Sequence, residues 1–182
     1  MIIGITGTNG AGKGTVVEYL KTKGFRHFSA RSFFVEEINK QGLPVNRDTM
    51  TQIANKLRAE NGPEYFAQVA LREAEKVGGD WVIESIRTLG EADYLKLNKA
   101  ILWGVNADER IRYERIQLRA SETDKISFNK FLEDEEREWN NTDRTKQNLQ
   151  AVIGMADYVF KNNATQEELF EEVEKELSKL KN

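Results

Sequence analysis

The sequence lacks cysteine, contains a single histidine and has only two prolines. The absence of cysteine excludes disulfides, thiolate catalysis and zinc sites built on cysteine. One histidine leaves little material for Ser–His catalysis or a histidine-ligated metal, and we assign His27, in the segment from Phe25 to Phe28, a structural role. The prolines, Pro44 and Pro63, are interpreted as breaks between helices.

Long apolar runs and an excess of positive charge are also missing. No segment approaches transmembrane length, and the N-terminus has the pattern of a strand rather than of a signal peptide, so we expect a cytoplasmic protein without a membrane partner. The net charge of −3 argues against a broad nucleic-acid surface but allows a local basic pocket. The length of 182 residues suits a single domain over 1–182 with a substantial core.

The most informative stretch runs from Gly7 to Thr15 and reads Gly-Thr-Asn-Gly-Ala-Gly-Lys-Gly-Thr. It connects a predicted strand to a predicted helix. Glycines let successive backbone N–H groups surround an anion, and the helix directs the positive end of its dipole toward it. Lys13 adds a charge that can follow a moving phosphoryl group. We assign seven residues to the binding of a nucleoside triphosphate: Asn9, Gly10, Ala11, Gly12, Lys13, Gly14 and Thr15.

The spacing of the glycines and the lysine fits the Walker A pattern with one difference. Gly14 stands where the general pattern has Ser or Thr, and the hydroxyl follows one residue later at Thr15. In this form the loop resembles that of adenylate kinase and related nucleoside monophosphate kinases. The resemblance implies a P-loop kinase fold that uses ATP with Mg²⁺.

A second polar group follows the predicted third strand, in the stretch Glu84–Thr88. Ligands bind beyond the carboxyl ends of parallel strands, so we expect Glu84 and Arg87 to face the nucleotide cleft. Glu84 and Thr15 are the candidate Mg²⁺ ligands, directly or through water, and Arg87 can bind a second phosphate. The stretch resembles the acid-x-x-Pro-Arg stretch of adenylate kinase, with Ile86 in place of the proline and Glu84 in place of the aspartate. A charge pair on a solvated turn is the alternative.

Arginines also mark a predicted helical insertion at about residues 31–78. In monophosphate kinases the corresponding insertion holds the acceptor nucleotide, and its arginines contact the acceptor phosphate. The resemblance therefore implies acceptor binding by Arg31, Arg47 and Arg58, together with Glu84 and Arg87. Solvated surface arginines are the alternative. We assign the aromatic residues of the insertion to the core rather than to base stacking: Phe33, Phe34, Tyr65 and Phe66.

Three further arginines, Arg112, Arg115 and Arg119, recur at a spacing that places them on one side of a predicted helix. The charged segment that follows, at about 120–144, occupies the place where a lid begins in the resembled family. The resemblance implies that Arg115 and Arg119 approach the transferring phosphates when this lid closes. A solvated helix with internal salt bridges would have some of the same pattern.

The stretch from Ala156 to Asn163 resembles the last strand and following turn of dephospho-CoA kinases. In that family an Ala-Asp pair before the strand and an Asn after it help form the wall of the adenine site. The resemblance implies a nucleotide-binding role for Asn162. The alternative is a strand that leaves the sheet through an Asn-Asn turn.

Apolar patterns separated by turn signals predict alternating strands and helices. The predicted strands lie near Met1–Ile5, Arg26–Ser29, Trp81–Glu84, Ala100–Val105 and Tyr158–Phe160. Predicted helices follow the glycine-rich loop, start at the caps Thr88 and Thr165, and otherwise cover Ser32–Gln41, Asp48–Glu60, Pro63–Lys76, Ala107–Arg119, Ser127–Trp139 and Lys146–Met155. This alternation predicts a three-layer α/β/α P-loop NTPase fold with a five-stranded parallel sheet.

These patterns together predict an ATP-dependent kinase that transfers the γ-phosphoryl group to a small acceptor. Its catalytic residues would be Lys13, Arg87, Arg115 and Arg119. A nucleoside monophosphate is the first choice of acceptor, and the ribose hydroxyl of a dephospho-CoA-like molecule is the alternative. A regulatory NTPase and a nucleotide-binding protein without transfer activity are further alternatives, although the Asn-Lys-x-Asp motif of guanine-specific switches is absent. Base preference and oligomeric state stay open.

Overall fold

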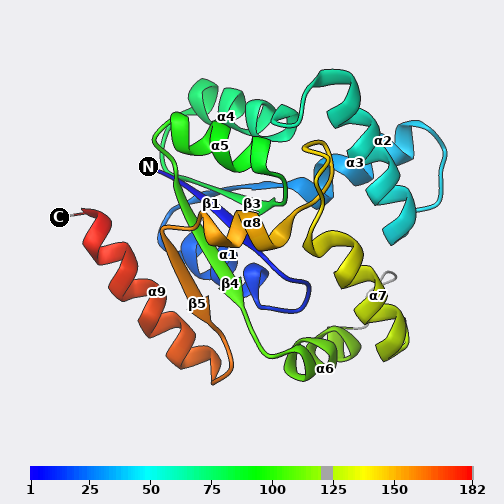
Figure 1. The fold of residues 1–182 in the computed structure, drawn as a ribbon. Coiled ribbons are helices and arrows are strands. Elements are labelled where there is room, and N and C mark those ends of the chain that lie inside the picture. Colours follow the sequence, from blue (N-terminus) through cyan, green and yellow to red (C-terminus); the bar gives the residue numbers. More distant parts are fainter. Residues whose placement is uncertain (120–124, 182) are drawn as a thin grey trace.

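The computed structural model describes residues 1–119 and 125–181, and these form a five-stranded sheet in the order β2-β3-β1-β4-β5 (Figure 1). Each pair of neighbouring strands is parallel. The strands are β1 (Ile2–Gly7), β2 (Arg26–Ser29), β3 (Trp81–Ile86), β4 (Ile101–Asn106) and β5 (Tyr158–Lys161). The prediction of five parallel strands is confirmed, and each strand overlaps the segment predicted for it.

Helices follow the strands in alternation and also fill the long connection between β2 and β3. They are α1 (Lys13–Thr22), α2 (Ala30–Lys40), α3 (Arg47–Asn61), α4 (Tyr65–Val77), α5 (Leu89–Leu97), α6 (Glu109–Arg119), α7 (Phe128–Trp139), α8 (Leu149–Gly154) and α9 (Gln166–Lys181). The helical insertion predicted at about 31–78 corresponds to α2, α3 and α4.

Side-chain caps fix several helix starts, and some differ from those predicted. Thr88 heads a capping box at α5, as predicted. The helix predicted from Ser32 begins earlier, at Ala30, because Ser29 is its cap and accepts a hydrogen bond from the Ser32 N–H. Asn148 caps α8, which therefore starts later than predicted. α6 also starts later than predicted.

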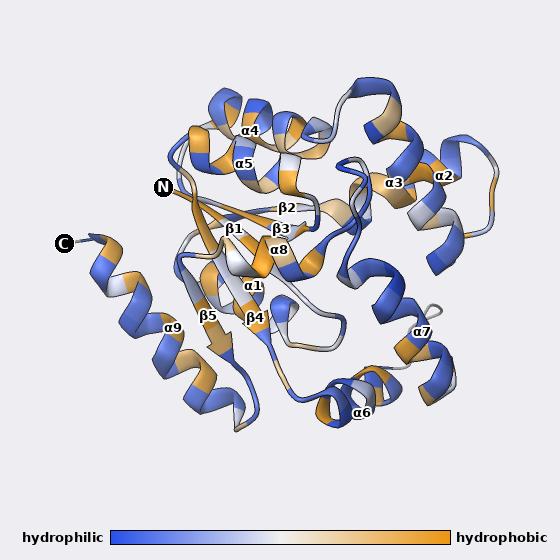
Figure 2. Ribbon diagram, in the orientation of Figure 1, coloured by the Kyte–Doolittle hydropathy of each residue, from blue (hydrophilic) through white to orange (hydrophobic). Residues whose placement is uncertain are grey.

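The sheet is covered on both faces, which accounts for the apolar character of its strands (Figure 2). On one face Ile3 and Val82 pack with α1 and α9. On the other, Ile83 and Leu102 pack with α2 to α5 and α8. These three layers are the predicted α/β/α architecture. Within the described residues, no helix has the length and hydropathy needed to cross a membrane.

The carboxyl ends of the central strands lead into the loops and helices that build the site. In Figure 1, α2 and α3 lie on one side of this edge, α6 and α7 lie on the other, and the glycine-rich loop is between them. Here β3 is irregular: its register with β1 shifts next to Ser85, which has a φ of 71°. A positive φ at a residue other than glycine is a strained conformation that is often found in binding sites.

Candidate functional site

The conformation of the glycine-rich loop depends on contacts with residues that are distant in the sequence. Gly10 and Gly12 have φ angles of 78° and 102°. A Cβ on Gly12 would lie 2.2 Å from the Asn162 Nδ2, and one on Gly10 would lie 2.4 Å from the Arg112 carbonyl oxygen. Asn162 Nδ2 also donates to the Ala11 carbonyl at 2.8 Å. Both glycines are therefore required by close approach as well as by backbone conformation.

Lys13 lies buried beneath the loop. Its Nζ donates to the carbonyl oxygens of Gly7 at 2.9 Å and Thr8 at 2.7 Å. Burial, reinforced by the charge of Arg87, lowers the pKa of Lys13 to about 7, although Glu84 acts in the opposite direction. An anion bound in the loop would stabilise the charged form of this side chain.

Two cavities open on either side of Lys13. The insertion cavity, of about 310 Å³, lies against the predicted insertion and is lined by residues that include Arg31, Phe34, Arg47, Arg58, Arg87 and Glu138. The loop cavity, of about 400 Å³, is lined by residues that include Gly10, Gly12, Gly14, Thr15, Arg115 and Asn162. Four residues line both cavities: Asn9, Lys13, Glu84 and Arg119. The two cavities therefore meet at the predicted phosphate site.

The loop cavity contains the predicted nucleotide residues except Ala11, which is buried and offers its carbonyl to Asn162. It also has oxygen ligands for Mg²⁺, because the Thr15 hydroxyl and the Glu84 carboxylate line the same space. Among the described residues no group of three or more His, Cys, Asp or Glu could hold a metal. The lining of the loop cavity would therefore fit a Mg²⁺ ion that takes some of its ligands from the protein and the others from nucleotide phosphates.

The carboxylate of Glu84 contacts His27, the only histidine in the sequence. Its Oε2 lies 3.2 Å from His27 Nε2, and the two residues come from neighbouring strands. Burial disfavours the charged form of Glu84, but the His27 hydrogen bond and the charge of Lys13 outweigh it and hold its pKa below the usual range. Glu84 is therefore an ionised carboxylate next to the phosphate loop, and His27, assigned a structural role from the sequence, contacts it directly.

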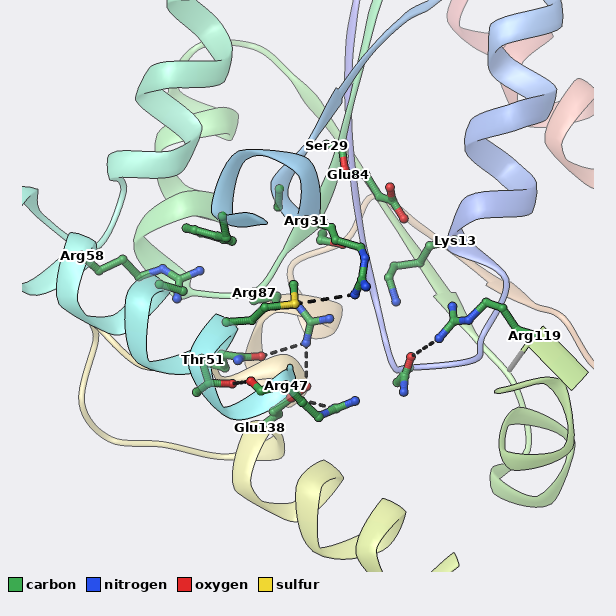
Figure 3. Close-up of a pocket in the computed structure, with 17 residues that line it drawn as sticks. Lys13, Ser29, Arg31, Arg47, Thr51, Arg58, Glu84, Arg87, Arg119 and Glu138 are labelled. Atoms are coloured by element: carbon green, nitrogen blue, oxygen red, sulfur yellow. Dashed lines mark hydrogen bonds and ion pairs between the residues drawn. The ribbon is translucent and has the colours of Figure 1, made fainter. Parts of the chain in front are cut away.

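The insertion cavity brings together arginines from α2, α3, the turn after β3, and α6 (Figure 3). Arg47 Nη2 donates to Glu138 Oε1 at 2.7 Å, and Arg87 Nη1 donates to Glu138 Oε2 at 2.6 Å. Burial opposes ionisation of Glu138, but Arg87 and Arg47 outweigh it and lower its pKa. Glu138 thus joins two guanidinium groups, and Arg47 forms a second ion pair with Asp134. The excess of positive charge belongs to the cavity lining as a whole, which has one lysine and five arginines against Glu84 and Glu138.

Glu138 was not among the residues predicted from the sequence, although a signal for it was present. In α7, Asp134 and Glu138 are spaced by four residues and share the buried face with Phe131. Acids repeated on the apolar face of an amphipathic helix indicate buried partners of opposite charge. The sequence alone does not give the identity of those partners.

The other predicted acceptor residues lie in the same cavity with different surroundings. Arg31 is exposed and its Nη1 lies 3.6 Å from the Met50 sulfur. Arg58 is almost completely buried and forms an ion pair with Glu91, which is also buried. Arg31, Arg47, Arg58 and Arg87 are therefore brought together, but only two of them contact Glu138.

The three arginines of α6 that were predicted to share one side of the helix have different surroundings. Arg112 is buried and forms an ion pair with Glu135 of α7. Arg115 Nη1 donates to the Asn162 carbonyl at 2.8 Å and lines the loop cavity. Arg119 Nη2 lies 3.4 Å from Asn9 Oδ1 and lines both cavities. The predicted lid at 120–144 begins with residues outside the described ones, and α7 is the described helix within it.

Similarities to known proteins agree with this architecture. Residues 3–141 match the AAA domain family. A UPF0200 protein of Thermococcus kodakarensis is 30% identical over 96% of this chain and 95% of its own length. The chain belongs to the AAA domain family and to the UPF0200 proteins. A UPF0200 protein of Methanococcus maripaludis strain C6 is likewise 30% identical, over 100% of this chain and 98% of its own.

Solved structures share the fold of this family member over nearly its whole length. TT1252 from Thermus thermophilus has a TM-score of 0.66 at 20% identity and covers 99% of this chain and 97% of its own. A shikimate kinase from Bacteroides thetaiotaomicron has a TM-score of 0.59 at 11% identity and covers 98% of each chain. At such identities the likeness shows the fold, which is that of P-loop kinases. The likeness leaves the reaction and its acceptor open.

Proposed function

We propose that the protein is an ATP-dependent kinase that transfers the γ-phosphoryl group to a small phosphorylated acceptor, a nucleoside monophosphate. The supporting observation is that the loop cavity and the insertion cavity meet at Lys13 and Glu84. A donor phosphate in one cavity and an acceptor in the other would face each other across Lys13. Phosphoryl transfer depends mainly on such positioning and on electrostatic stabilisation.

The charge of the insertion cavity favours an acceptor that carries a phosphate. Glu138 pairs with both Arg47 and Arg87, and Arg47 also pairs with Asp134. The cavity lining as a whole is positive, because it contains one lysine and five arginines but only two carboxylates, those of Glu84 and Glu138. A phosphate oxygen attacks without losing a proton, so this acceptor needs no general base. The resemblance of Glu84–Arg87 to the corresponding stretch of adenylate kinase supports the same choice.

The proposed catalytic residues line one or both cavities: Lys13 and Arg119 line both, Arg87 the insertion cavity and Arg115 the loop cavity. Lys13, Arg87, Arg115 and Arg119 would neutralise charge on the transferring group. Thr15 and Glu84 would help hold Mg²⁺, which bridges donor phosphates and offsets their charge when bound. Asn162 would contribute to nucleotide binding by stabilising the conformation of the glycine-rich loop through its hydrogen bond to the Ala11 carbonyl.

A hydroxyl-bearing acceptor, such as a dephospho-CoA-like ribose, is the second candidate. Glu84 favours it, since an ionised carboxylate at the junction of the cavities can accept a proton from a hydroxyl. The shikimate kinases that share the fold are named for an acceptor of this kind. The two candidates differ in product, because one forms a phosphoanhydride and the other a phosphate ester.

The test is release of ADP from ATP in the presence of nucleoside monophosphates or of dephospho-CoA, with the product identified by mass. We expect Lys13→Ala to lower turnover by at least about a hundredfold, the scale of losing one preorganised charge. Lys21→Ala is the matched control, because Lys21 lies on the same helix but is exposed and pairs with Glu18. Near-normal turnover by Lys13→Ala would overturn phosphoryl transfer at this loop.

A further inference from the structure

Arg58 has an incomplete set of hydrogen bonds although it is buried. Its Nε donates to Glu91 Oε1 at 2.9 Å, and its Nη2 lies 2.8 Å from the same oxygen. The Nη1 is buried and has no partner among the described residues. A guanidinium N–H left unpaired in the interior is costly, so an oxygen supplied by a ligand at this point would be strongly favoured.

The orientation of Arg58 is fixed by its surroundings. Glu91 Oε2 accepts the N–H groups of Arg87 at 2.8 Å and Thr88 at 3.2 Å, so its carboxylate cannot turn toward Nη1. The Arg58 guanidinium carbon lies 5.8 Å from the centre of the Phe34 ring. The guanidinium edge formed by Nε and Nη2 is therefore occupied by Glu91, and Nη1 lies on the opposite side of the guanidinium group.

Arg58 lines the insertion cavity beside apolar side chains, and Figure 3 shows its guanidinium directed from α3 toward the interior of that cavity. Phe34, Met50 and Ala54 line the same cavity. Charged residues of the same lining include Lys13, Glu84 and Arg87. An acceptor with its phosphate near Arg87 could place a flat apolar group against Phe34 with one polar edge toward Arg58.

We propose that Arg58 makes the site selective for nucleobases that carry an oxo group where the competing base carries an amino group. This rests on the proposed function, since it concerns the acceptor of the same reaction. Arginine can only donate hydrogen bonds. A carbonyl oxygen would complete the contacts of Nη1, as in the pairing of arginine with guanine O6. An exocyclic amino group at the same place would present a second donor and leave both unpaired.

Two pairs of acceptors of similar size test this in the wild-type protein: guanosine against adenosine monophosphate, and uridine against cytidine monophosphate. In the pair that is phosphorylated, we expect kcat/KM to be at least about tenfold higher for the oxo member, because a site built to bond one group rejects the analogue that lacks it. Equal rates, or a preference for the amino member, would overturn the inference and leave the proposed kinase function intact.

A variant separates the role of Nη1 from the role of charge. Arg58→Lys keeps a cation for Glu91 but has no Nη1, so we expect the oxo preference to fall to within about threefold. Arg72→Lys is the control, since Arg72 is exposed on α4 and donates a hydrogen bond to Gln68. Unchanged preference in a folded Arg58→Lys protein would contradict the inference. If no monophosphate is phosphorylated, the proposed acceptor and this inference fail together.

Discussion

At the scale of single residues, the pKa of Lys13 is set by its contacts and its burial. Its partners are carbonyl oxygens, and its pKa of about 7 results first from burial and then from repulsion by Arg87. In an unfolded chain a lysine titrates near pH 10.4, that is, at about three units higher. Between these values the unfolded state binds more protons, so the contribution of Lys13 makes the free protein more stable as the pH rises above about 7.

We predict that the protein takes up close to one proton when it binds ATP at about pH 8. Without ATP the Lys13 amine is mostly neutral at this pH, and the negative charge of the polyphosphate raises its pKa above the pH of the solution, so the amine becomes protonated. Titration calorimetry in buffers with different ionisation enthalpies measures this uptake. Lys21→Met, which changes an exposed lysine of the same helix, should leave the uptake unchanged. Binding of ATP to the wild-type protein without uptake would contradict the assignment of Lys13 as the titrating group.

At the scale of elements, α7 is attached to the rest of the site through charged side chains. Glu138 contacts Arg47 of α3 and Arg87 beyond β3, while Glu135 pairs with Arg112 of α6. Phe131 adds an apolar anchor, with its ring centre 5.7 Å from that of Tyr113. The phosphate of an acceptor would compete with Glu138 for the same guanidinium groups. The assignment of residues 120–144 as a lid stays a prediction. Competition between the acceptor phosphate and Glu138 would be the means by which the position of α7 responds to the acceptor.

Glu138→Gln should therefore lower the free energy of unfolding by about 1–3 kcal/mol, because two half-buried arginines lose their shared anion. Inorganic phosphate should then raise the melting temperature of the variant more than that of the wild type. Glu136→Gln is the control, as Glu136 is an exposed acid of the same helix. Equal effects of phosphate on the variant and the wild type would show that Glu138 does not occupy an anion site.

At the scale of the whole molecule, the two faces of the sheet depend on the same strands. Val82 and Ile83 are consecutive in β3, yet they belong to different apolar clusters. Leu102 and Trp103 of β4 are divided in the same way. Loss of either cluster would expose the strands that hold the other. We therefore propose that the chain unfolds as one cooperative domain.

Tryptophan fluorescence can test this cooperativity. Trp139 lies at the end of α7 and is partly exposed, whereas Trp103 is buried in β4. In a variant whose only tryptophan is Trp139, made with Trp81→Phe and Trp103→Phe, we predict that urea unfolding followed by fluorescence and by far-ultraviolet circular dichroism has one midpoint. An earlier fluorescence midpoint would show that α7 unfolds separately. A variant that retains Trp103 alone is the control.

The features that the sequence determined by itself are those encoded by neighbouring residues. The glycine-rich loop between β1 and α1 is one, because its glycines, Lys13 and the start of α1 are contiguous, although its contacts with Asn162 and Arg112 come from distant elements. The five strands and the capping box at Thr88 are others. Strands that alternate with helices leave few topologies other than a parallel sheet. The position of Glu84 and Arg87 at the carboxyl end of a predicted strand added the expectation that both face the nucleotide cleft.

Only the tertiary structure decided which charged groups meet. Arg47 and Glu138 are 91 residues apart, His27 and Glu84 are 57 apart, and Arg58 and Glu91 are 33 apart. Periodicity can place a charge on the buried face of a helix, but its partner depends on how separate elements dock against one another. The sequence therefore predicted arginines near an acceptor, whereas their docking left Arg87 and Arg47 sharing an anion and Arg58 with one unpaired donor.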